Sequence, residues 1–105
     1  MAKTKSKVIA DITIFPVGTG SSVGDYVRSA FKAMGKVKHV RLIPNSMSTV
    51  IEADNLETVL LTVSKAHTAI TKMGAKRVYM ILKIDHRLDK QENAKYKLDR
   101  IQGKI

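Results

Sequence analysis

Residues 8–22 read VIADITIFPVGTGSS, and this stretch decides how the rest of the chain is interpreted. Apolar side chains alternate with others from Val8 to Phe15, which is the period of a β-strand. Pro16 and the Gly-Thr-Gly-Ser-Ser run then end the strand, and apolar residues at helical spacing follow from Val23. A strand that turns directly into a helix presents free backbone N–H groups at the turn, so this corner is a candidate ligand or subunit contact.

Composition predicts a single cytoplasmic domain. The chain has 105 residues, of which 44% are hydrophobic, and this is enough to form a core. No apolar run approaches the roughly 18 residues of a membrane helix, and no signal peptide is evident, so we expect no membrane partner. The absence of cysteine excludes disulfides, thiol catalysis and zinc–thiolate sites. The histidines show no metal-binding spacing, and we expect neither a metal nor a cofactor.

The net charge of +10 raises the question of nucleic-acid binding. The basic residues are concentrated at the two ends, in a basic N-terminal arm at 1–7 and a charged C-terminal tail at 87–105 that is compatible with a short helix. The folded domain is expected between them, at 8–86. Charged tails of this kind are typically solvated, so we expect at most weak, non-specific nucleic-acid binding.

The first strand–helix–strand unit spans residues 8–44. Ser22 is the expected N-cap of its helix, with Asp25 three residues later as the acidic half of a capping pair. Apolar residues at helical spacing continue to Gly35, which is expected to end the helix. Residues 37–43 then predict a second strand.

A second unit at 47–85 repeats this order. Its expected elements are a strand at 47–53, a helix that Asp54 and Glu57 cap and Gly74 ends, and a strand at 77–85. Right-handed crossovers and a central hairpin convert two such units into a four-stranded antiparallel sheet with both helices on one face. The predicted fold class is α+β, the ferredoxin-like βαββαβ fold.

One face of this sheet has no helix to cover it. The purer apolar sets should face the helices, namely Val8, Ala10, Ile12 and Ile14 on the first strand and Val78, Met80, Leu82 and Ile84 on the last. The opposite face, which we call the open face, would then carry Ile9, Asp11, Thr13, Phe15, Tyr79, Ile81, Lys83 and Asp85, with His39, Arg41, Ile43, Ser48, Val50 and Glu52 from the hairpin. A surface that is half apolar and half charged usually meets a partner or a ligand. A homo-oligomer with a site shared between subunits and a plain oligomer interface without a ligand both remain open.

Two local features also allow two interpretations. The carboxylates of Asp11 and Glu52 suit a cationic or amino-substituted ligand, but they could instead pair with Lys83 or Arg41. The loop at 18–22 could hold an anion at the helix start, or it could be an ordinary tight turn. No nucleophile–histidine–acid set stands out, so we expect no catalysis, and the third strand lacks the aromatics with which RNA-recognition domains stack bases.

Three separated blocks, in order, resemble the small thiamine-binding-protein family: IFPVGTGSSVGDYV, PNSMSTVIEADNLE and GAKRVYMILKIDHRLDK. The resemblance covers roughly residues 8–90. It implies a ferredoxin-like fold, dimers that pair into a tetramer, and non-catalytic binding of thiamine or its hydroxymethylpyrimidine part. The family's usual Met-Gly-Thr step is here Met47-Ser48-Thr49.

From these observations the expected ligand is thiamine or a thiamine-like aminopyrimidine. The residues expected to contact the heterocycle are Asp11, Thr13, Thr49 and Glu52, and those expected to close the rim are Ser21 and Ser22. The alternative is a nucleic-acid-associated or purely structural oligomer that uses its basic ends.

Overall fold

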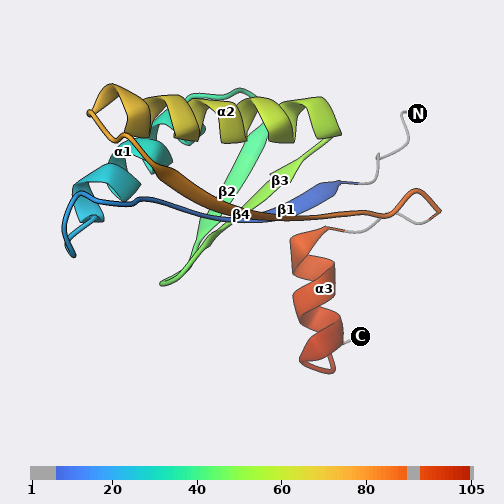
Figure 1. Cartoon of the computed structure of the whole chain (residues 1–105). Helices are drawn as coiled ribbons and strands as arrows, with labels where there is room; N and C mark the ends of the chain where they lie inside the picture. The colour runs from blue at the N-terminus through green and yellow to red at the C-terminus, as the bar shows by residue number, and fades with distance from the viewer. Residues whose placement is uncertain (1–6, 90–92, 105) are drawn as a thin grey trace.

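A computed structural model of the chain describes residues 7–89 and 93–104. Within these residues the elements are β1 (Val8–Pro16), α1 (Gly24–Gly35), β2 (Val40–Pro44), β3 (Thr49–Ala53), α2 (Leu56–Lys72), β4 (Val78–His86) and α3 (Ala94–Ile101). The strands form a 4-stranded antiparallel sheet in the order β2-β3-β1-β4. Figure 1 shows α1 and α2 side by side on one face of the sheet, while α3 projects from the other. The predicted ferredoxin-like α+β fold is therefore confirmed.

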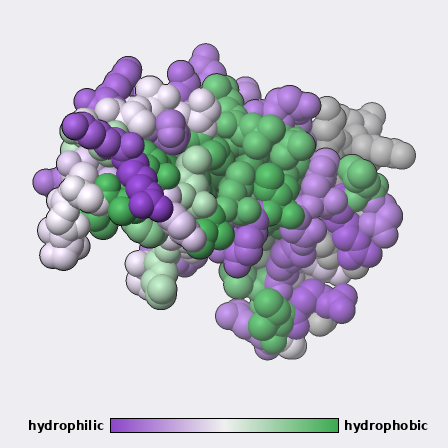
Figure 2. All heavy atoms as spheres, in the orientation of Figure 1, coloured by the Kyte–Doolittle hydropathy of each residue, from purple (hydrophilic) through white to green (hydrophobic). Residues whose placement is uncertain are grey.

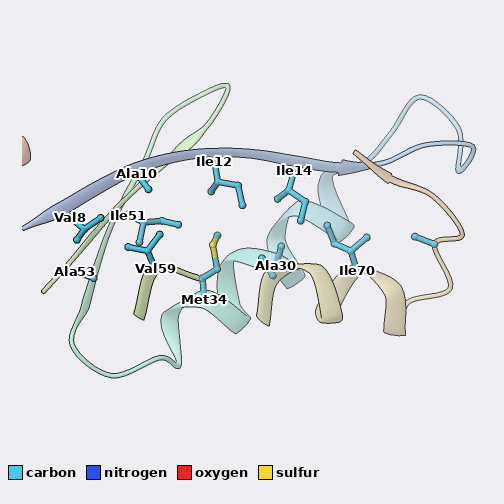
Figure 3. Packing of buried hydrophobic residues seen from close by; sticks show 12 residues of the cluster. Val8, Ala10, Ile12, Ile14, Ala30, Met34, Ile51, Ala53, Val59 and Ile70 are labelled. Carbon is cyan, nitrogen blue, oxygen red and sulfur yellow. The ribbon is translucent and has the colours of Figure 1, made fainter. Parts of the chain in front are cut away.

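The core lies between β1 and the two long helices. Val8, Ala10, Ile12 and Ile14 are each at most 7% exposed, as the alternation predicted. Figure 3 shows these side chains pointing from β1 toward residues of α1 and α2, including Ala30, Met34, Val59 and Ile70. This burial stabilises the fold by about 25 cal/mol for each Å² of apolar surface removed from water.

The last strand, β4, lies at the edge of the sheet and is only partly covered. Its register pairs Met80 with Ile14 and Ile84 with Ala10, so the predicted apolar set does face the helices. Met80 and Ile84 are nevertheless 40% and 41% exposed, because α2 packs mainly over β1 and β3. Figure 2 shows hydrophobic atoms gathered in the middle of the view, where α2 and β4 lie.

The capping predictions were each wrong by one residue. The N-cap of α1 is Val23 rather than Ser22, and its side chain makes no capping hydrogen bond. The N-cap of α2 is Asn55 rather than Asp54: the Asn55 carboxamide oxygen accepts a hydrogen bond of 2.8 Å from the Thr58 backbone N–H. Asp54 pairs instead with Lys7. Asn55 has the extended backbone that an N-cap requires, and it lies three residues before the free N–H group that it satisfies.

Strand β2 starts at Val40, three residues later than predicted. His39 has a φ of 65°, in the left-handed region that a strand residue does not adopt, so it belongs to the turn after α1. Helix α3 forms inside the charged C-terminal tail, where Asn93 caps it. Residues 1–6 of the predicted N-terminal arm lie outside the described residues. No helix in the described part of the chain is long and apolar enough to cross a membrane.

Candidate functional site

Strand β1 continues beyond the end of its neighbour β3. It has 9 residues and β3 has 5, and their pairing runs from Val8 with Ala53 to Ile12 with Thr49. Within the described residues, β1 pairs only with β4 from residue 13 onward. On the side of β1 that β3 does not cover, residues 45–48 form the turn of the β2–β3 hairpin. A 2.8 Å hydrogen bond from the Asn45 N–H to the Ser48 carbonyl oxygen closes this turn.

A pocket of about 380 Å³ opens at this place between β1, α1 and the hairpin turn. This volume lies toward the lower end of the range for small-molecule sites. Its apolar wall includes Val23, Val27, Phe31 and Met34, which follow one face of α1 from its N-cap to its last turn, together with Ile12, Ile14 and Phe15 of β1.

Polar groups enter the pocket from β1, from the end of β3 and from α1. The Thr13 hydroxyl donates a hydrogen bond of 3.2 Å to the Met47 carbonyl oxygen, and Thr49 lies at the first position of β3. Arg28 is the single charged residue among those lining the pocket. Among the described residues, no backbone hydrogen bond joins 13–15 to the turn at 45–48. The backbone N–H and C=O groups of β1 on that side are therefore available to a ligand.

The structure brings Thr13 and Thr49 to one pocket although they lie on opposite faces of the sheet. Thr49 pairs with the buried Ile12, on the helical side, and Thr13 lies on the open face. The pocket contacts both because it wraps around the edge of β1 that β3 leaves uncovered. Ser21 and Ser22 are exposed in the loop that leads to the lining residue Val23.

Asp11 lies two residues before Thr13 on the open face, outside the pocket lining. Its Oδ2 is 3.9 Å from the Lys83 ammonium nitrogen. Its Oδ1 is buried and has no hydrogen-bond partner. A buried acceptor without a donor is costly, so this atom would gain from a donor or a positive charge brought to it.

The sixth predicted residue, Glu52, is placed away from the pocket and is only 7% exposed. Its Oε2 accepts a 2.8 Å hydrogen bond from the Ala94 N–H at the start of α3, and its Oε1 is 4.0 Å from the Arg41 guanidinium. The Arg41 pairing is one of the two interpretations that the sequence left open. The contact with Ala94 was not foreseen.

Sequence reasoning missed the α1 and hairpin-turn residues that form most of the pocket. Val27, Phe31 and Met34 were visible as an apolar helical stripe, which by itself indicates only packing against the core. The signal that could have found them is the difference in length between the first and third strands. No group of three His, Asp or Glu side chains in the described part of the chain could hold a metal ion.

Residues 10–102 match the family model described as thiamine-binding protein. The chain is 36% identical over 99 residues to a UPF0045 protein of Methanothermobacter thermautotrophicus, an alignment that covers 93% of this chain and 99% of that protein. The crystal structure of the hypothetical protein MJ1052 of Methanocaldococcus jannaschii is similar with a TM-score of 0.83 and 35% identity, over 94% of this chain and 98% of that one. A proposed thiamine biosynthesis/salvage protein of Thermotoga maritima has the same fold, with a TM-score of 0.75 at 17% identity over 90% of this chain and 98% of that one.

Proposed function

The chain belongs to the thiamine-binding-protein family, and we propose that it is a non-catalytic, oligomeric protein that binds thiamine or a thiamine-like aminopyrimidine. The observation that carries the proposal is the pocket at the end of the β2–β3 hairpin. It combines an apolar wall with a strand edge that no neighbouring strand pairs, and it lies within the matched region.

In this proposal the aminopyrimidine ring occupies the pocket. Phe31 and the 40% exposed Val27 offer apolar surface for the ring faces, since aromatic and aliphatic side chains pack well on flat rings. The Thr13 and Thr49 hydroxyls and the unpaired groups of β1 can exchange hydrogen bonds with the ring nitrogens and the amino group. Ser21 and Ser22 would close the rim from the loop before α1.

Asp11 is the residue that we assign to the positively charged thiazolium ring. Two residues along a strand span about 7 Å, so Asp11 and Thr13 are separated by a distance that suits two rings joined by one methylene group. The Asp11 Oδ1 lacks a hydrogen-bond partner, and the Lys83 side chain near Oδ2 is 76% exposed and free to move aside. Glu52 has no role in this arrangement because α3 already uses its carboxylate.

The oligomer is proposed to form over β4. On the open face, Tyr79 and Ile81 are 47% and 49% exposed, and the Tyr79 ring stacks on Phe15 with centroids 5.4 Å apart. On the other face of the same strand, Met80 and Ile84 are also partly exposed. An apolar strand of 9 residues whose outer side pairs with no other strand in the described part of the chain favours association with a second copy. Light scattering at micromolar concentration should give two or four times the mass of the chain, and a monomer mass would contradict this part of the proposal.

Calorimetric titration with thiamine and with free hydroxymethylpyrimidine tests the ligand assignment. Thr13→Val should weaken both ligands by a few fold, because a neutral hydrogen bond contributes about 0.5–1.5 kcal/mol. Asp11→Asn should weaken thiamine about tenfold and leave the uncharged pyrimidine unchanged. Asp99→Asn on α3 removes the same charge far along the chain and serves as the control, with no expected change for either ligand. If the unmodified protein gives no heat with thiamine at millimolar concentration, the assignment is wrong.

A further inference from the structure

The outer surface of the two long helices carries a second cavity, which we call the lysine cleft. It has a volume of about 400 Å³ and lies between α1 and α2. Lys32 of α1 and Lys36, the C-cap residue of α1, line one side, and Lys65 and Lys72 line the other from α2. The short side chains of Ala33 and Ala69 leave room between the helices, because neither extends beyond its Cβ.

The charge of this cleft is not balanced. No acidic side chain lines it, and none of the four lysines forms an ion pair within the described part of the chain. Several lysines elsewhere are paired, for example Lys7 with Asp54 and Lys95 with Asp99. Four like charges around one cavity repel each other and attract an anion.

We propose that the lysine cleft binds the phosphate backbone of a double-stranded nucleic acid without reading its sequence. Besides the lysines, the hydroxyls of Ser29 and Thr68 line the cleft, and such groups commonly contact phosphate oxygens. The cleft has no aromatic side chain on which unpaired bases could stack, which argues against single strands. It has no arginine, carboxylate or amide side chain for bidentate contact with a base edge, which favours contact with phosphate oxygens.

The spacing of the lysines suits several phosphates at once. Lys65 and Lys72 are seven residues apart, which is about 10 Å along α2, and Lys32 and Lys36 are about 6 Å apart along α1. A duplex carries one negative charge per about 1.7 Å of its axis, so phosphates are available over the whole length of the cleft. Helices α1 and α2, whose side chains line the cleft, lie on the opposite side of the sheet from α3 (Figure 1). A ligand or a second subunit on the open face would therefore leave the cleft accessible.

The proposal predicts a specific salt dependence. Four neutralised phosphates give a slope of log K against log salt of about −3.6, which is a loss of about a hundredfold between 50 and 200 mM salt. The double variant Lys36→Gln/Lys65→Gln removes one charge from each wall and should reduce the slope to about −1.8. The control Lys95→Gln/Lys104→Gln removes the same two charges from the region of α3 and should leave the slope nearly unchanged.

Fluorescence anisotropy with a labelled 20-base-pair duplex at several salt concentrations measures both slopes, and circular dichroism confirms that each variant is folded. A lower slope in the cleft variant than in the control supports the proposal. Equal slopes in the two double variants would place the binding outside the cleft and overturn it, as would the absence of duplex binding at 50 mM salt. Tighter binding of a single strand of the same length, or of inorganic triphosphate alone, would also overturn the assignment to duplex backbone.

Discussion

Replacing Glu52 by Gln should loosen helix α3 and leave ligand binding unchanged. Glu52 is 7% exposed, and its Oε2 accepts the N–H of Ala94, the first residue of α3, at 2.8 Å. That N–H belongs to the helix N-terminus, where a negative charge is favourable. With eight residues, α3 is too short to be stable in isolation, so it depends on contacts of this kind.

The magnitude follows from the chemistry of this contact. A hydrogen bond to a charged group contributes about 1.5–3 kcal/mol and a neutral one about 0.5–1.5 kcal/mol. The Gln side chain keeps the shape and can still accept the Ala94 N–H through its amide oxygen. The expected loss is therefore the difference, about 1 kcal/mol, in the equilibrium between attached and detached α3. This corresponds to about fivefold faster amide hydrogen exchange in the second half of α3.

Hydrogen exchange of α3 and titration with thiamine should be measured on the same variants. Glu57→Gln is the matched control, because Glu57 is an exposed glutamate in the first turn of α2 and loses the same charge. The expected pattern for Glu52→Gln is faster exchange in α3 with thiamine affinity within twofold of the unmodified protein. Unchanged exchange together with a tenfold loss of affinity would refute this reasoning and make Glu52 a ligand residue, as the sequence first suggested.

Two further predictions concern stability. Asn55→Ala should lower the free energy of unfolding by about 1 kcal/mol because it removes the N-cap of α2. Ser22→Ala should change the free energy of unfolding by less than about 0.5 kcal/mol because α1 has no side-chain cap. Equal losses for the two variants in urea unfolding would contradict the assigned caps. Ile12→Val should cost about 0.5–1.5 kcal/mol because the side chain is only 2% exposed, and a thermal midpoint unchanged within 1 °C would show that the core collapses around the lost methyl group.

The strongly periodic parts of the fold were predictable from the sequence. Alternation from Val8 to Phe15 predicted strand β1 and its buried face. Successive side chains of a strand point to opposite faces, so in a sheet with one covered face every second residue is buried. The ends of elements were predicted less well. Asp54 and Asn55 are both good N-caps, and only the backbone conformation decides between neighbours. His39 reads as a strand residue until its positive φ is known.

The candidate site was only partly predictable, for a different reason. Thr13 and Thr49 were assigned to one site, and the pocket brings them together because β3 begins only at Thr49 and leaves the second half of β1 uncovered. The role of Glu52 could not be predicted, because its partner Ala94 is 42 residues away in a tail whose polar composition gives little sign of docking. A single contact between distant segments produces no repeating pattern of residues, so it cannot be predicted from periodicity.

The attachment of α3 also determines which carboxylate remains for a cationic ligand. Of the three predicted on the open face, Glu52 accepts the Ala94 N–H, and Asp85 pairs with Lys97 of α3. Among these three, Asp11 alone has a buried oxygen without a hydrogen-bond partner in the described part of the chain, and it lies two residues from Thr13. The pocket itself offers a charged ligand only Arg28, which repels a cation. Asp11 must therefore account for any preference of this site for thiamine over the uncharged pyrimidine. Without its charge, the pyrimidine alone should be the better ligand.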